Sequence, residues 1–68
     1  MFPRVSELDA FPFHIEVWTQ DDMRVSERLA VAKNASVAQA AYKAALEERP
    51  DRIVRLRSRA RVMEERLP

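Results

Sequence analysis

The residues of this chain best suited to chemistry are arginines spaced two positions apart. Arg55, Arg57, Arg59 and Arg61 alternate with other residue types near the C-terminus. Successive side chains of a β-strand point to opposite faces, so an extended segment would place all four guanidinium groups on one face. A guanidinium group makes planar, two-pronged contacts with carboxylates and phosphates. The spacing therefore predicts a cationic strip that suits either acids of the same chain or an anionic partner.

A second set of candidates lies in segment 13–19, where apolar and polar residues alternate as in a strand. One face carries His14, Glu16 and Trp18, and the other carries Phe13, Ile15 and Val17. If the arginine segment pairs with this strand, the aromatic and the acid share a face with the arginines. We predict a candidate interaction face made of His14, Glu16, Trp18, Arg55, Arg57, Arg59 and Arg61.

Catalytic and metal sites have no comparable support. His14 is the only histidine and cysteine is absent, so carboxylates without ligand spacing would have to complete a metal site. Glycine is also absent, which excludes a glycine-rich phosphate loop. Ser26, Ser36 and Ser58 lie in no recognisable nucleophile motif. Glu16 and Glu27 each lie beside arginines, which indicates ion-pair partners rather than an acid and base pair. We predict no catalytic residue, no cofactor and no metal.

Three elements are needed to position the candidate face. Asp21 and Asp22 predict a turn, and the alternation over 23–33, with Val25, Leu29 and Val31 on one side, predicts a strand that completes a hairpin. A helix capped by Asp22 is the alternative for 23–33. Ser36 and Gln39 have the spacing of a capping box, and the alanine-rich run behind them predicts a helix that ends near Arg49, before Pro50. Its buried face would contain Val37, Ala38, Ala41, Ala44 and Ala45, with Tyr42 at the edge.

The segment from 52 to 65 fits two periods. As a strand it alternates apolar residues with arginines, and as a helix it places Ile53, Leu56 and Ala60 on one seam. Its β-branched residues favour a strand that pairs with segment 13–19. Because strands are usually shorter, this one would bend near Ser58, fold back as a second hairpin or extend as an arm. The helical alternative gives an all-α hairpin.

Composition limits the architecture. With 68 residues the chain holds one thin domain, and its formal charge of +1 hides a basic C-terminal part. The N-terminal sequence shows no secretory signal or membrane span, and the lack of cysteine suits a reducing compartment, so we expect a cytoplasmic protein that does not contact a membrane. We predict an α+β fold of order β-β-α-β, with about three antiparallel strands and one helix on one face. Its parts are an irregular arm over 1–12, the domain over 13–65 and a tail over 66–68.

Several short runs also resemble a known group of sequences. They are Ile15 to Trp18, Val37 to Tyr42, Leu56-Arg57 and Ala60 to Val62. Over 13–63 the chain resembles a group of short, uncharacterised bacterial proteins with no known activity. The resemblance implies a bacterial source. Such sequences often have a glycine where this chain has Ser58 and Arg59, which argues against a tight hairpin at that point.

Taken together, these features predict a small non-enzymatic interaction module that self-associates as a homodimer and binds a protein partner. A thin core, an uncovered sheet face and exposed strand edges all favour association. The alternative is a nucleic-acid-binding accessory protein that uses the arginine-lined face, with bases stacked on Trp18.

Overall fold

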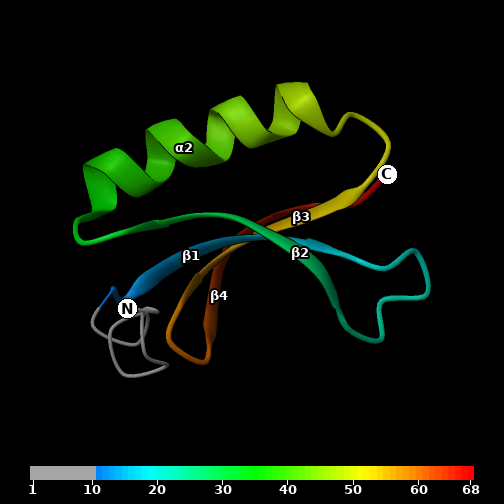
Figure 1. Cartoon of the computed structure of the whole chain (residues 1–68), viewed down its shortest axis with the longest axis horizontal. Helices are drawn as coiled ribbons and strands as arrows, with labels where there is room; N and C mark the ends of the chain where they lie inside the picture. Colours follow the sequence, from blue (N-terminus) through cyan, green and yellow to red (C-terminus); the bar gives the residue numbers. More distant parts are fainter. Residues whose placement is uncertain (1–10) are drawn as a thin grey trace, which may run out of the picture.

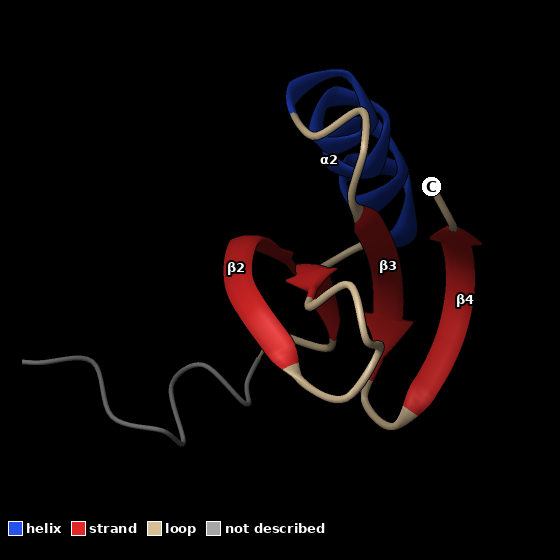
Figure 2. Cartoon of the chain, turned by 90° about the vertical axis from the view of Figure 1, so that its right-hand side faces the viewer, coloured by secondary structure: helices blue, strands red, loops and turns tan. Residues whose placement is uncertain are grey.

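The computed structural model describes residues 11–68, so residues 1–10 of the predicted arm lie outside it. The elements are β1 (Phe13–Trp18), β2 (Val25–Ala32), α2 (Ala35–Glu48), β3 (Ile53–Ser58) and β4 (Arg61–Arg66). The four strands form one antiparallel sheet in the order β2-β1-β3-β4, and α2 lies across one face of it (Figures 1 and 2). The predicted α+β class and the pairing of β3 with β1 are confirmed. The prediction of about three strands is wrong, because residues 61–66 fold back on β3 as a fourth.

The core lies between the helix and the two central strands. Ile15 and Val17 of β1 stand opposite Leu56 and Val54 of β3, and all four side chains are fully or almost fully buried. Residues directly opposite in an antiparallel pair share a face, so this apolar patch faces α2. Burying each such side chain stabilises the fold by roughly 1.5–3 kcal/mol. The alternation in segment 13–19 therefore decides which face the helix covers.

The helix begins and faces the sheet differently from the prediction. Asn34, rather than Ser36, is its N-cap, with the Asn34 side chain accepting a hydrogen bond of 2.9 Å from the Val37 amide. Asparagine is among the best residues at this position. The buried residues of the helix are Ala38, Tyr42 and Ala45, whereas Val37 is 54% exposed. Centring the face on Tyr42 buries the ring, the largest side chain of the helix, which explains why Val37 turns outward.

A β-bulge changes the phase of β2. Ile15 pairs with Ala30 while the next residue, Glu16, pairs with Arg28, so Leu29 is an extra residue. A bulge of this kind lets two residues of one strand oppose one of the other and reverses the alternation beyond it. As a result Val31 and Val25 stand opposite His14 and Trp18 on the face away from the helix, whereas Leu29 packs against the core. The prediction that these three residues share one side is wrong.

Both hairpins turn without glycine. Asp22 and Arg59 have positive φ angles of 61° and 58°. The first turn is stabilised by Asp21, whose carboxylate accepts a hydrogen bond of 3.1 Å from the Met23 amide. In the second turn the Arg59 amide donates to the carbonyl of Pro12 at 3.0 Å. The expectation that Ser58 and Arg59 disfavour a tight hairpin is therefore wrong.

Candidate functional site

The face of the sheet away from α2 is centred on a buried carboxylate. Glu16 of β1 is 0% exposed although no helix covers it. Arg57 of β3 donates two hydrogen bonds of 2.7 Å to it, one from Nε to Oε1 and one from Nη2 to Oε2. Arg28 of β2 lies 3.7 Å away, and the indole N–H of Trp18 donates to Oε1 at 3.3 Å. A buried carboxylate is tolerated only when it is paired and hydrogen-bonded in this way.

The neighbouring arginine on β3, Arg55, is also neutralised within the chain. It forms an ion pair with Asp22 and a second with Glu65 of β4 at 3.1 Å, and its guanidinium carbon lies 4.8 Å from the centre of the Trp18 ring. The hydrogen bond from Arg55 holds the pKa of Asp22 below its ordinary value. A cation over an indole ring adds a further attraction. Arg55 thus holds the first turn against the outer strand.

Only part of the predicted face is assembled. His14, Glu16 and Trp18 do share the helix-free face with Arg55 and Arg57, since β1 and β3 pair in the register that places His14 opposite Arg57 and Glu16 opposite Arg55. The strip ends there, because the chain turns at the next positions.

The other two arginines of the strip are separated by the turn. Arg61 stands opposite Ser58, whose side chain lies on the same face as those of Leu56 and Val54, so Arg61 belongs to the helix side of the sheet. Arg59 occupies the turn itself. The prediction that all four arginines line one face is wrong, because it assumed an uninterrupted strand.

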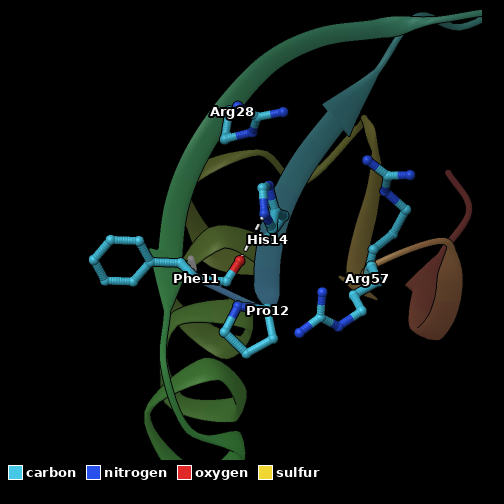
Figure 3. Close-up of a pocket in the computed structure, with 6 residues that line it drawn as sticks. Phe11, Pro12, His14, Arg28 and Arg57 are labelled. Atoms are coloured by element: carbon cyan, nitrogen blue, oxygen red, sulfur yellow. Dashed lines mark hydrogen bonds between the residues drawn. The ribbon is translucent and has the colours of Figure 1, made fainter. Parts of the chain in front are cut away.

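A pocket of about 370 Å³ opens beside Glu16 at the end of β1 where the chain enters the sheet. Its lining residues are Phe11, Pro12, His14, Arg28, Arg57 and Arg59. Figure 3 shows Arg28 on β2 at one side, His14 on β1 in the middle and Arg57 on β3 at the other side. The pocket therefore collects cationic side chains from two strands and a turn.

The histidine of the pocket is fixed by the backbone. Its Nε2 lies 2.9 Å from the carbonyl oxygen of Phe11, and because a carbonyl only accepts, Nε2 carries the hydrogen (Figure 3). The second ring nitrogen, Nδ1, is buried and has no hydrogen-bond partner in the described part of the chain. His14 is thus a fixed wall of the pocket.

Sequence reasoning missed Arg28, Phe11 and Pro12 as lining residues. The predicted hairpin could have indicated Arg28, since an acid on one strand, here Glu16, and a base on the adjacent strand form a favourable pair. Its exact position depends on the bulge at Leu29, which the alternation does not reveal. The two acids expected to be ion-pair partners are confirmed as such, because Glu16 pairs with Arg57 and Glu27 pairs with Arg49 at 2.8 Å.

Residues 11–68 contain no group of three or more His, Asp or Glu side chains arranged to hold a metal ion. None of the helices in this range is long and apolar enough to cross a membrane. Comparisons with protein families, curated proteins and solved structures find no match. The resemblance to short bacterial proteins therefore stays a prediction.

Proposed function

We propose that this chain is a small non-enzymatic interaction module that self-associates through the edge strand β4 and presents its arginine pocket to a partner. The observation that carries the proposal is the exposure of β4. Five of its six residues are exposed, and the helix packs on β1, β2 and β3. The side of β4 away from β3 has no neighbouring strand in the sheet of residues 11–68. Such an edge offers unpaired backbone groups to a second strand.

The sequence of β4 fits a second copy of itself. Leu56 pairs with Glu64 and Arg57 pairs with Val62, so Met63 is an extra residue of β4, and Arg61 and Glu64 lie on the same face of the sheet. A two-fold antiparallel pair centred between these two residues brings Arg61 next to Glu64 of the second copy and makes this ion pair twice. Val62, 44% exposed, and Met63, 39% exposed, lie at the centre of this contact and would be covered by the second copy. The other edge, β2, carries two register irregularities against one in β4, so its pairing with a further strand is disturbed more. We therefore assign the dimer contact to β4 and extend the sheet from four strands to eight.

A charge swap tests the contact. Arg61→Glu should raise the dissociation constant of the dimer by roughly tenfold or more, because two attractive pairs become repulsive. The double change Arg61→Glu with Glu64→Arg should restore dimerisation. Arg24→Glu is the matched control, since Arg24 is exposed in the first turn and makes no ion pair among residues 11–68. Sedimentation of each variant over a wide concentration range gives the constants. A wild-type chain that stays monomeric throughout contradicts the proposal.

The alternative, a nucleic-acid-binding accessory protein, has weaker support from the geometry. Arg55 donates from all three of its nitrogens to Asp22 and Glu65, and its guanidinium lies over the Trp18 ring. The ring is then not free to stack on bases, and Arg55 is already neutralised within the chain. A titration with single-stranded oligonucleotide at low salt distinguishes the two functions. Saturable binding that Arg55→Gln weakens would favour the alternative.

Our proposal also places the module in the cytoplasm of a bacterium. The sequence resemblance supports the bacterial source, and a chain without cysteine is compatible with a reducing compartment. A co-purification screen from bacterial cells, with nuclease treatment, tests for the protein partner. A partner that survives the nuclease supports a protein contact.

A further inference from the structure

We propose that the arginine pocket, formed by His14, Arg28, Arg57 and Arg59 with Phe11 and Pro12, is a binding site for the phosphate group of a phosphate monoester. Three guanidinium groups reach the pocket from β2, from β3 and from the turn between β3 and β4. Guanidinium groups are suited to phosphate oxygens because they present several N–H donors in one plane. A site lined by three of them matches the three terminal oxygens of a monoester.

The charge of the site fits this ligand. Arg28, Arg57 and Arg59 supply three positive charges, and Glu16, in contact with the first two, removes one. These four side chains leave two positive charges. A phosphate monoester carries about −1.5 to −2 at neutral pH, so its charge matches that of the pocket. A carboxylate carries only one negative charge and leaves the pocket under-neutralised.

The donors are held in place before any ligand binds. Arg57 uses Nε and Nη2 on the buried carboxylate of Glu16, which leaves Nη1 and the outer hydrogen of Nη2 for a ligand. Its side chain is still 27% exposed, and that of Arg28 is 38% exposed. Rigid placement of this kind lowers the entropy lost on binding. Glu16 thus acts as a positioning residue that lies beneath the site and does not face the ligand.

Within residues 11–68, Arg59 is the one arginine of the site that makes no ion pair, and its side chain is exposed. Its backbone is fixed by the hydrogen bond from its amide to the Pro12 carbonyl. The turn therefore holds a free guanidinium at the rim of a pocket that already contains two others.

The site is suited to binding rather than to bond cleavage. The Nε2 hydrogen of His14 is committed to the Phe11 carbonyl and its Nδ1 is buried, so the ring is not placed to exchange a proton with a ligand. Glu16 is fully buried beneath the arginines. The guanidinium groups that line the rest of the pocket are not deprotonated in proteins, so they cannot act as a general base.

The test is a titration of the full chain, labelled with nitrogen-15, with inorganic phosphate and with O-phosphoserine at constant ionic strength. We expect saturable shifts in the backbone amides of His14, Arg28, Arg57 and Arg59 for both probes, with acetate at least tenfold weaker. Binding of inorganic phosphate alone, without O-phosphoserine, would show that the pocket does not accept a monoester and would overturn the proposal. Equal binding of acetate would also overturn it, because it would show a pocket for any anion.

Two charge-matched variants make the result specific. Arg59→Gln should weaken O-phosphoserine binding by roughly tenfold, in line with the loss of one charge-assisted contact. Arg24→Gln, which removes the same charge from the exposed first turn, should change it by less than about twofold. Equal weakening by both would reveal general attraction to a basic surface and overturn the site. An oligonucleotide without a terminal phosphate that binds as tightly as its 5′-phosphorylated form would equally count against a monoester.

Discussion

A carboxylate buried on the face of a sheet that no helix covers needs other residues to exclude water, and the contacts of Glu16 show which ones do so. Arg57 donates to both oxygens, Trp18 donates to Oε1, and Arg28 forms an ion pair with Oε2 at 3.7 Å. Arginine and tryptophan side chains have apolar parts that exclude water while their polar atoms bind the acid. The charged cluster therefore takes the place of a second hydrophobic layer.

Replacing the central acid should be costly. We predict that Glu16→Gln lowers the free energy of unfolding by about 2–4 kcal/mol, since it leaves the Arg57 guanidinium poorly compensated next to a buried amide. Glu27→Gln is the control, because the Glu27–Arg49 pair is partly exposed to solvent, so its loss should destabilise the fold much less. Urea unfolding followed by circular dichroism measures both. Equal effects would show that Glu16 is solvated in solution.

Arg59, in the second turn, is a position where a substitution should raise stability. Arg59 has a φ of 58°, a conformation that costs a residue with a Cβ roughly 1–2 kcal/mol and costs glycine little. Arg59→Gly should therefore raise stability by about 0.5–1 kcal/mol after the added chain entropy is subtracted. The neighbouring substitution Ala60→Gly relieves no positive φ and should lower it. Thermal unfolding of the two variants checks the sign, and a destabilised Arg59→Gly would mean that its side chain holds the turn.

At the scale of the elements, the ion pair between the first turn and β3 links stability to pH. The pKa of Asp22 is lowered below 3.8 because Arg55 hydrogen-bonds its carboxylate. The folded state then binds fewer protons than the unfolded state, so the contribution is complete above the unfolded pKa and is lost as the pH falls through the folded one. We predict that Asp22→Asn, which tolerates the positive φ of this position, makes the loss of stability below about pH 4 less steep.

The control for this pH dependence is Asp51→Asn. Asp51 is exposed and has no ion pair in the described residues. Its replacement should therefore leave the loss of stability at acidic pH unchanged. Unfolding by urea at a series of pH values gives the two slopes. Identical slopes for Asp22→Asn and the wild type would show that Arg55 does not hold this carboxylate in solution.

The close approach of helix and sheet depends on alanine. Ala38 is fully buried at the contact between α2 and the sheet, while Ala44 of the same helix is exposed. Ala38→Leu should destabilise the fold by about 1–3 kcal/mol because no room exists for the added methylenes. Ala44→Leu should stay within about 0.5 kcal/mol. Both variants are compared by urea unfolding, and a tolerated Ala38→Leu would show that the helix can move away from the sheet.

The sequence predicted those elements that depend on local patterns alone. The alternation from Phe13 to Trp18 correctly predicts β1 and its two faces, and Pro50 correctly predicts the end of the helix. The bulge at Leu29 and the turn at Arg59 were not predictable, because each depends on tertiary contacts that outweigh local preference. The pocket depends on both irregularities, which is why only two of its three arginines belonged to the predicted face.

The molecule has two layers, the sheet and the helix, and the helix layer covers only part of the sheet. The helix covers β1, β3 and part of β2 and does not pack extensively on β4 (Figure 2). A chain of 68 residues buries a small core, and an edge left open by the helix is then the natural place for reinforcement by a second copy. Among residues 11–68, no element covers the face with Glu16 and the arginines.

The central position of β1 also determines how this chain reaches its native state. β1 and β2 are neighbours along the chain, as are β3 and β4, yet the pair between Glu16 and Arg57 joins residues 41 positions apart. The buried side chains of β1 and β3 meet only when the two hairpins meet, so neither hairpin has a core of its own. Closing that long loop should therefore set the refolding rate. Leu56→Val should slow refolding more than it speeds unfolding, as measured by stopped-flow mixing. A larger effect on the unfolding rate would show that the two hairpins join after the transition state of folding.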